Sequence, residues 1–146
     1  MKDILKWPLI AAALAVVLRV VAERAGAPHF ISASLSVAAL ITVLGPLYFA
    51  IRIGSAGTER PYLTLLKLVL IYAICARAMV LPTYWMARIY NWPEPRFAGL
   101  AGSSPFVGFV ALPLLTAAFW IAASVILGGA VGAAALTMAR ARTKSA

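Results

Sequence analysis

A chain of 146 residues that is 64% hydrophobic and only 12% charged, with a mean hydropathy of +0.96, is too apolar for a water-soluble domain, because one core could not hide two-thirds of its residues. The continuous apolar runs, rich in alanine and leucine, predict membrane-spanning helices and disfavour a β-barrel, whose strands alternate. The net charge of +9 comes from basic residues beside these runs, so we do not expect nucleic-acid binding.

The first apolar run covers residues 7–22. It has the length of the hydrophobic segment of a secretory signal peptide, with residues 25–27 (Ala-Gly-Ala) as a cleavage site. Arg19 interrupts the end of the run, and Glu23 stands just before that site. These charges favour an uncleaved transmembrane helix over residues 4–24.

The second run predicts a span over residues 31–52, because it is uncharged until Arg52 and matches the roughly 20 residues that cross a bilayer. Pro46 should kink this helix, since proline lacks a backbone donor and crowds the preceding turn. The third run predicts a span over residues 62–88, which is longer than a perpendicular crossing needs and which Pro82 should bend or break.

A connection rich in glycine and proline, residues 91–105, cannot continue a helix. The aromatic cluster around its start, typical of a membrane interface, consists of Tyr84, Trp85, Tyr90 and Trp92. The fourth run predicts a span over residues 106–134 and stays apolar to Met138. This helix therefore either tilts strongly or leaves the membrane with its last turns.

The basic residues predict that both termini lie in the cytoplasm. Eight of them then flank the inner side, namely Lys2, Lys6, Arg52, Arg60, Lys67, Arg140, Arg142 and Lys144. Five are left for the outer half, namely Arg19, Arg24, Arg77, Arg88 and Arg96. We therefore expect residues 1–146 to form a single all-α membrane domain, a polytopic four-helix bundle with N-in/C-in topology. We expect this multi-pass protein in the cytoplasmic (inner) membrane of a bacterium.

Arg77 is the most informative residue, because it lies inside the third apolar run. An unpaired guanidinium at the bilayer centre costs about 2.5–3.5 kcal/mol on insertion scales, so Arg77 should face the interior and find an acidic partner. Glu23 lies at the matching depth, and we predict a Glu23–Arg77 contact with Arg19 one helical turn below Glu23. Arg77 then either ties two helices together or serves a ligand or ion, and both hypotheses stay open.

Arg19 also allows two hypotheses. A long basic side chain near a helix end can snorkel to the interface without any function. Alternatively, Arg19, Arg77 and Arg88 form an outward-facing basic pocket for an anionic lipid headgroup or a small organic anion.

The fourth run carries three small residues at four-residue spacing, Ser124, Gly128 and Gly132. Small residues four apart let two helix backbones approach closely. They predict a helix-association face, used either within the bundle or between copies of the chain in a homo-oligomer.

No catalytic constellation is visible, because the chain holds one histidine, one cysteine and one aspartate and none of the common catalytic motifs. His29 lies in a loop and Cys75 stands alone within an apolar run. We therefore expect no haem, zinc or other cofactor and no intrachain disulfide.

The sequence thus favours a non-enzymatic helical-bundle module or accessory subunit that self-associates or joins a larger membrane complex. The alternative is a carrier or binder of an anionic lipid or small organic anion, and a membrane enzyme that acts on lipid ranks third. The first two hypotheses differ in the surroundings of Arg77. A dry contact with Glu23 favours the module, whereas a cavity beside Arg77 favours the binder.

Overall fold

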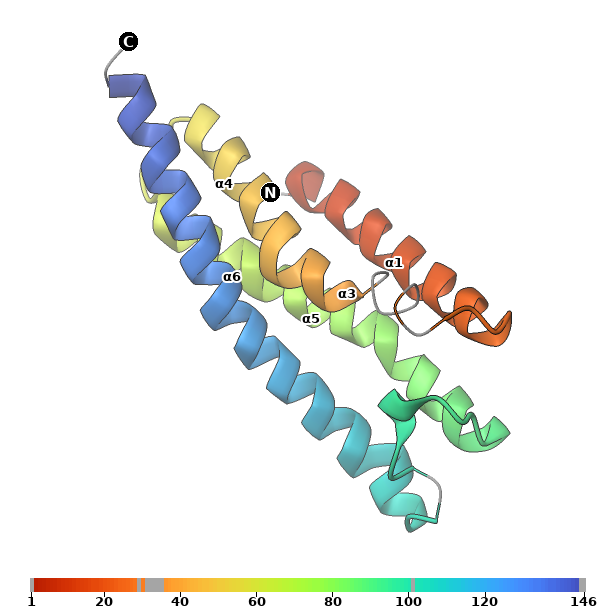
Figure 1. Ribbon diagram of the computed structural model, residues 1–146. Coiled ribbons are helices and arrows are strands. Elements are labelled where there is room, and N and C mark those ends of the chain that lie inside the picture. The colour runs from red at the N-terminus through yellow and green to blue at the C-terminus, as the bar shows by residue number, and fades with distance from the viewer. Residues whose placement is uncertain (1, 29, 31–35, 101, 145–146) are drawn as a thin grey trace.

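The computed structural model describes residues 2–28, 30, 36–100 and 102–144 (Figure 1). All regular elements in these ranges are helices, and no strand occurs among them, which confirms the all-α prediction. Four helices are long and apolar enough to cross a membrane. In chain order the elements are α1 (Lys2–Arg24), α3 (Val37–Ala39), η1 (Leu40–Leu44), α4 (Gly45–Ser55), α5 (Pro61–Tyr90), η2 (Pro95–Phe97), η3 (Val107–Ala111) and α6 (Leu112–Lys144).

The helix ends follow from local capping. The predicted start of the second span, at residue 31, lies outside the described residues, and its described part begins after Ser36, whose Oγ accepts the N–H of Ala38 at 3.2 Å. Helix α5 ends where Asn91 takes a left-handed conformation with φ of 48° and donates its N–H to the Ala87 carbonyl. It continues through Pro82, so this proline does not break it.

Two π-helical turns end two residues before a proline. η1 is followed by Pro46 and η3 by Pro113. A proline inside a helix lacks the N–H donor and collides with the carbonyl four residues earlier, and a widened turn relieves that collision. The Phe109 carbonyl, four residues before Pro113, accepts the Trp85 indole N–H at 2.9 Å. A neighbouring helix thus supplies a hydrogen-bond donor close to the position where proline lacks one, which an apolar environment favours.

The main core lies where α4 and η1 pack between α5 and α6, while α1 packs chiefly against α5. Phe49 and Tyr72 are almost fully buried at its centre, with their rings edge to face at 5.6 Å. The outer faces of the helices expose large apolar side chains, among them Leu14, Leu115, Phe119 and Ile126. Such exposure is costly in water and normal in lipid.

Figure 1 shows how the helix ends are distributed. The α4–α5 connection and the end of α6 lie at the upper left of the view. The ends of α1 and α5, the connection of residues 91–106 and the start of α6 lie at the lower right. This second end carries the polar network described below.

Candidate functional site

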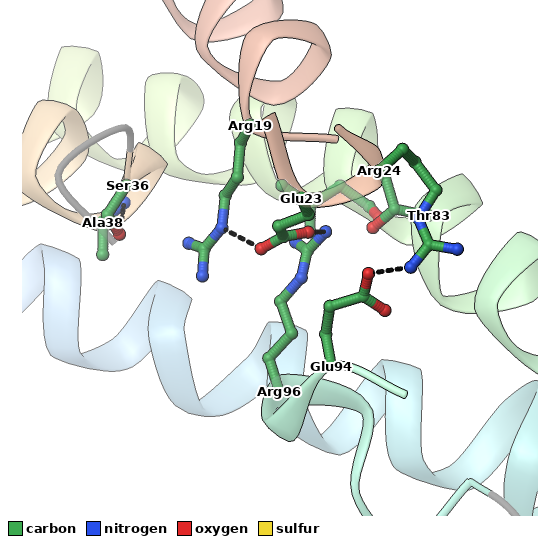
Figure 2. A network of polar contacts seen from close by, with 9 residues as sticks. Arg19, Glu23, Arg24, Ser36, Ala38, Thr83, Glu94 and Arg96 are labelled. Atoms are coloured by element: carbon green, nitrogen blue, oxygen red, sulfur yellow. Dashed lines mark hydrogen bonds and ion pairs between the residues drawn. The ribbon is translucent and has the colours of Figure 1, made fainter. Parts of the chain in front are cut away.

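Glu23 in the last turn of α1 joins two elements that are far apart in the sequence. Its Oε1 accepts a hydrogen bond from Arg19 Nε at 2.9 Å, and its Oε2 accepts one from Arg96 Nη2 at 2.5 Å. Only 7% of the Glu23 side chain is exposed. Figure 2 shows the carboxylate between the two guanidinium groups. The predicted placement of Arg19 one turn below Glu23 is confirmed, since four-residue spacing puts the two side chains on one helix face.

A second ion pair, between Arg24 and Glu94, holds the same connection to α1 (Figure 2). The Arg24 guanidinium also lies over the Trp92 ring, 4.8 Å from its centroid. The 3-10 turn that follows buries Phe97, whose ring packs edge to face on Tyr84 at 5.2 Å. The segment of residues 92–97 is therefore fastened to both α1 and α5.

Arg77 does not form the predicted ion pair with Glu23. That prediction is wrong, because the ion pairs of Glu23 are with Arg19 and Arg96 and none joins it to Arg77. The Arg77 side chain is buried, with 8% exposed, and its Nε and Nη2 have no hydrogen-bond partner in the described part of the chain. Its guanidinium lies over the Trp120 ring, 4.9 Å from the centroid, so α6 supplies the contact that α1 was expected to supply.

Arg77 instead borders a cavity of about 230 Å³ between the helices, which we call the arginine cavity. Its lining comes from α1, α3, α5, α6 and the connection after α5, namely Val16, Arg19, Ser36, Val37, Ala38, Arg77, Val80, Tyr84, Arg96 and Trp120. Three guanidinium groups therefore meet at one cavity, and none of the described lining residues is acidic. Such a site carries positive potential that water screens poorly.

Arg96 also has a hydrogen-bond donor that is not used. Its Nε is buried and has no hydrogen-bond partner among residues 2–28, 30, 36–100 and 102–144. Burial lowers the pKa of the Arg96 guanidinium below its ordinary value, and the Glu23 carboxylate acts in the opposite direction. Glu23 therefore offsets part of the cost of burying the Arg96 charge beside the cavity.

Arg88 belongs to the basic pocket in one of the two hypotheses for Arg19, but it does not line the arginine cavity. Its Nη1 donates to the Leu100 carbonyl and its Nη2 to the Ser103 carbonyl at 2.6 Å. Arg88 thus satisfies backbone carbonyls in the turn before η3, and Arg96 takes its place at the cavity. The sequence grouped Arg96 with Arg19 and Arg77 but gave no reason for its connection to fold back onto α1.

The small-residue face of α6 is occupied by the chain itself. Ser124, Gly128 and Gly132 are all buried. A Cβ on Gly128 would lie 2.9 Å from Pro46 Cγ, and one on Gly132 would lie 3.0 Å from Leu65 Cδ2. Of the two uses left open by the sequence, the structure therefore assigns this face to packing of α6 against α4 and α5.

The histidine and the cysteine noted in the sequence were considered as a ligand and a thiol. His29 lies outside the described residues. Cys75 is half-buried in α5, two residues before Arg77, and does not line the cavity. The arginine cavity is therefore the candidate site.

No known protein family, no characterised protein and no solved structure matches this chain. Its function is therefore argued from the cavity and its charges alone.

Proposed function

We propose that this chain is a multi-pass membrane protein that binds an anionic group, borne by a lipid headgroup or by a small organic anion, in the arginine cavity. One observation carries the proposal: Arg77 is buried at the cavity, and two of its nitrogens have no hydrogen-bond partner in the described ranges. A guanidinium in that state is costly, and a bound carboxylate or phosphate would supply both the missing charge and the missing acceptors.

The charge balance of the site supports an anion. Arg19, Arg77 and Arg96 contribute three positive charges, and Glu23 neutralises one of them. Guanidinium groups match carboxylate and phosphate oxygens with two parallel hydrogen bonds, which a point-like ammonium cannot do. Trp120 supports the Arg77 guanidinium from α6, so the group is already positioned before a ligand arrives.

We propose binding rather than catalysis. Guanidinium groups stay protonated and cannot act as general bases, and the Ser36 hydroxyl already caps α3. The hypothesis of a module that self-associates was favoured by the small-residue face of α6 together with the short loops and the scarcity of catalytic residues, and the packing of that face on Pro46 and Leu65 removes the first of these supports. Membership in a larger complex is compatible with anion binding and needs no separate site.

We also propose an N-in/C-in orientation in the cytoplasmic membrane of a bacterium, with the arginine cavity in the outer half of the bilayer. The excess of basic residues at the opposite end supports it. In a Cys75→Ser background, Ala98→Cys should react with a membrane-impermeant maleimide in intact cells. Ala56→Cys, also exposed but on the α4–α5 connection, should react only after the cells are permeabilised. The opposite labelling pattern would reverse the orientation.

Anion binding itself is tested by exchanging Arg77 for methionine. Arg77→Met should weaken the binding of phosphatidylglycerol, measured by native mass spectrometry, by about 10- to 100-fold, because charge-assisted hydrogen bonds contribute about 1.5–3 kcal/mol. Arg52→Met is the matched control, since it removes the same charge from an exposed position on α4. It should change binding less than twofold. Equal effects of the two substitutions on phosphatidylglycerol and on inorganic phosphate would contradict the proposed site.

The stability of the same variant separates a ligand site from a structural tie between helices. In lipid-free detergent, Arg77→Met should leave the free energy of unfolding unchanged or raise it by about 1–3 kcal/mol, because a buried charge with unpaired donors is replaced by an apolar chain of similar length. The measurement is unfolding by titration with sodium dodecyl sulfate in mixed micelles. A loss of several kcal/mol would mean that Arg77 holds the helices together instead.

A further inference from the structure

A second cavity, of about 220 Å³, is lined by residues nearer the N-terminus of α1. It is almost entirely apolar and is lined by Trp7, Pro8, Ala11, Leu40, Leu44, Gly45, Tyr48 and Tyr72. It exists because α1 packs chiefly against α5 and touches α4 only lightly, and because the residues that face it include alanine, glycine and proline. We call it the apolar groove.

The arginine cavity and the apolar groove are both lined by α1 and by the span that follows it in the chain. α1 contributes to both, with Arg19 at the first and Pro8 and Ala11 at the second. The span that contains α3, η1 and α4 also lines both cavities. Residues 36–38 border the arginine cavity, and residues 40–48 border the apolar groove. Because these two helices run antiparallel, Arg19 of α1 lies at the height of residues 36–38, and Pro8 and Ala11 lie at the height of residues 40–48.

The spacing of the two cavities matches half a bilayer. Arg19 is 8 residues from Ala11 and 11 from Pro8, which corresponds to roughly 12–17 Å along a helix. Half of the roughly 30 Å hydrocarbon core is about 15 Å, the depth that an acyl chain reaches from its headgroup. An anionic group bound by the arginines would therefore place an attached acyl chain at the level of the groove.

We infer that the anion bound in the arginine cavity is the phosphate of an anionic phospholipid, with one of its acyl chains in the apolar groove between α1 and residues 40–48. This inference rests on the proposed anion binding and narrows it. A small organic anion would use the arginine cavity alone, whereas a lipid uses both cavities. In the groove the acyl chain exchanges contact with mobile lipid tails for van der Waals contact with fixed side chains. The arginines therefore recognise the phosphate, and the groove adds affinity that only a molecule with an acyl chain can gain.

The test uses the full chain in phosphatidylcholine nanodiscs that contain a small share of phosphatidylglycerol, with binding measured by native mass spectrometry. Ala11→Phe fills the apolar groove without changing any charge, and Ala118→Phe is the control at an exposed alanine of α6 that lines neither cavity. Ala11→Phe should weaken phosphatidylglycerol binding about tenfold, because the ring and the acyl chain compete for one volume. Ala118→Phe should have no effect.

Glycerophosphoglycerol, the phosphodiester that remains when phosphatidylglycerol loses its acyl chains, separates the two levels of the proposal. We expect it to compete weakly with phosphatidylglycerol and to be insensitive to Ala11→Phe. If it competes as strongly as the lipid, or if Ala11→Phe leaves lipid binding intact, the lipid inference is overturned while Arg77-dependent anion binding stands. If Arg77→Met changes neither probe, anion binding at this site is itself refuted. Thermal unfolding of each variant confirms that the compared proteins are folded.

Discussion

Reversing the charge of Glu23, by Glu23→Arg, should lower the free energy of unfolding by about 3 kcal/mol. The carboxylate is the shared acceptor of Arg19 and Arg96, and its loss would leave three cationic groups together at a buried site. Breaking a buried ion pair costs about 3–5 kcal/mol, and the lower end applies because each arginine side chain remains 19% exposed. Denaturation in mixed micelles and the amount of protein in the membrane are the measurements.

A second charge reversal that restores the stability of Glu23→Arg identifies the ion-pair partner of Glu23. Arg96→Glu combined with Glu23→Arg should recover most of the lost stability, because the pair is restored with its charges exchanged. Arg77→Glu should rescue little, although the sequence by itself pointed to Arg77 as the partner. Glu59→Arg, an exposed charge reversal at the other end of the molecule, should change stability by no more than about 0.5 kcal/mol. Better rescue by Arg77→Glu than by Arg96→Glu would contradict the network in Figure 2.

Exchanging Gly128 for valine should destabilise the protein by about 2–3 kcal/mol. A Cβ at this position would lie 2.9 Å from Pro46 Cγ and 3.2 Å from the Ile41 carbonyl oxygen. Neither neighbour yields easily, because one is a buried ring and the other is backbone in the π-helical turn, so the helices must separate. Overpacking of a core typically costs about 1–3 kcal/mol.

The adjacent glycine provides the control for this experiment. A Cβ on Gly129 meets no atom within 4 Å, so Gly129→Val should leave the unfolding free energy close to that of the wild type. A homo-oligomer face would behave differently. In that case Gly128→Val would shift the oligomeric state in analytical ultracentrifugation and leave the unfolding of the single chain nearly unchanged.

The four long helices and the Arg19–Glu23 pair could be predicted because their causes are local. Hydrophobic run length determines how many helices can cross a bilayer, and four-residue spacing brings Arg19 and Glu23 to one helix face. The end of α5 at Asn91 is also a local event, although its conformation could not be read from the run of apolar residues.

The expectations that differ from the structure concern contacts between segments that are far apart in the sequence. Glu23 and Arg96 are 73 residues apart, and their ion pair exists only because the connection after α5 returns to α1. Matching residues by depth alone therefore chose Arg77 as the partner of Glu23. The same connection brings Leu100 and Ser103 to Arg88, which occupies that guanidinium with backbone carbonyls and removes it from the basic pocket.

The sequence by itself determined that the chain is helical, has four segments long enough to cross a membrane and holds an arginine within an apolar run. Only the tertiary structure decided which guanidinium groups meet at a cavity, that α6 packs its small residues inside the chain, and that a second, apolar groove is lined by α1 and the following span. The physical reason is that helix formation depends on neighbouring residues, whereas cavities and ion pairs depend on the packing of distant ones.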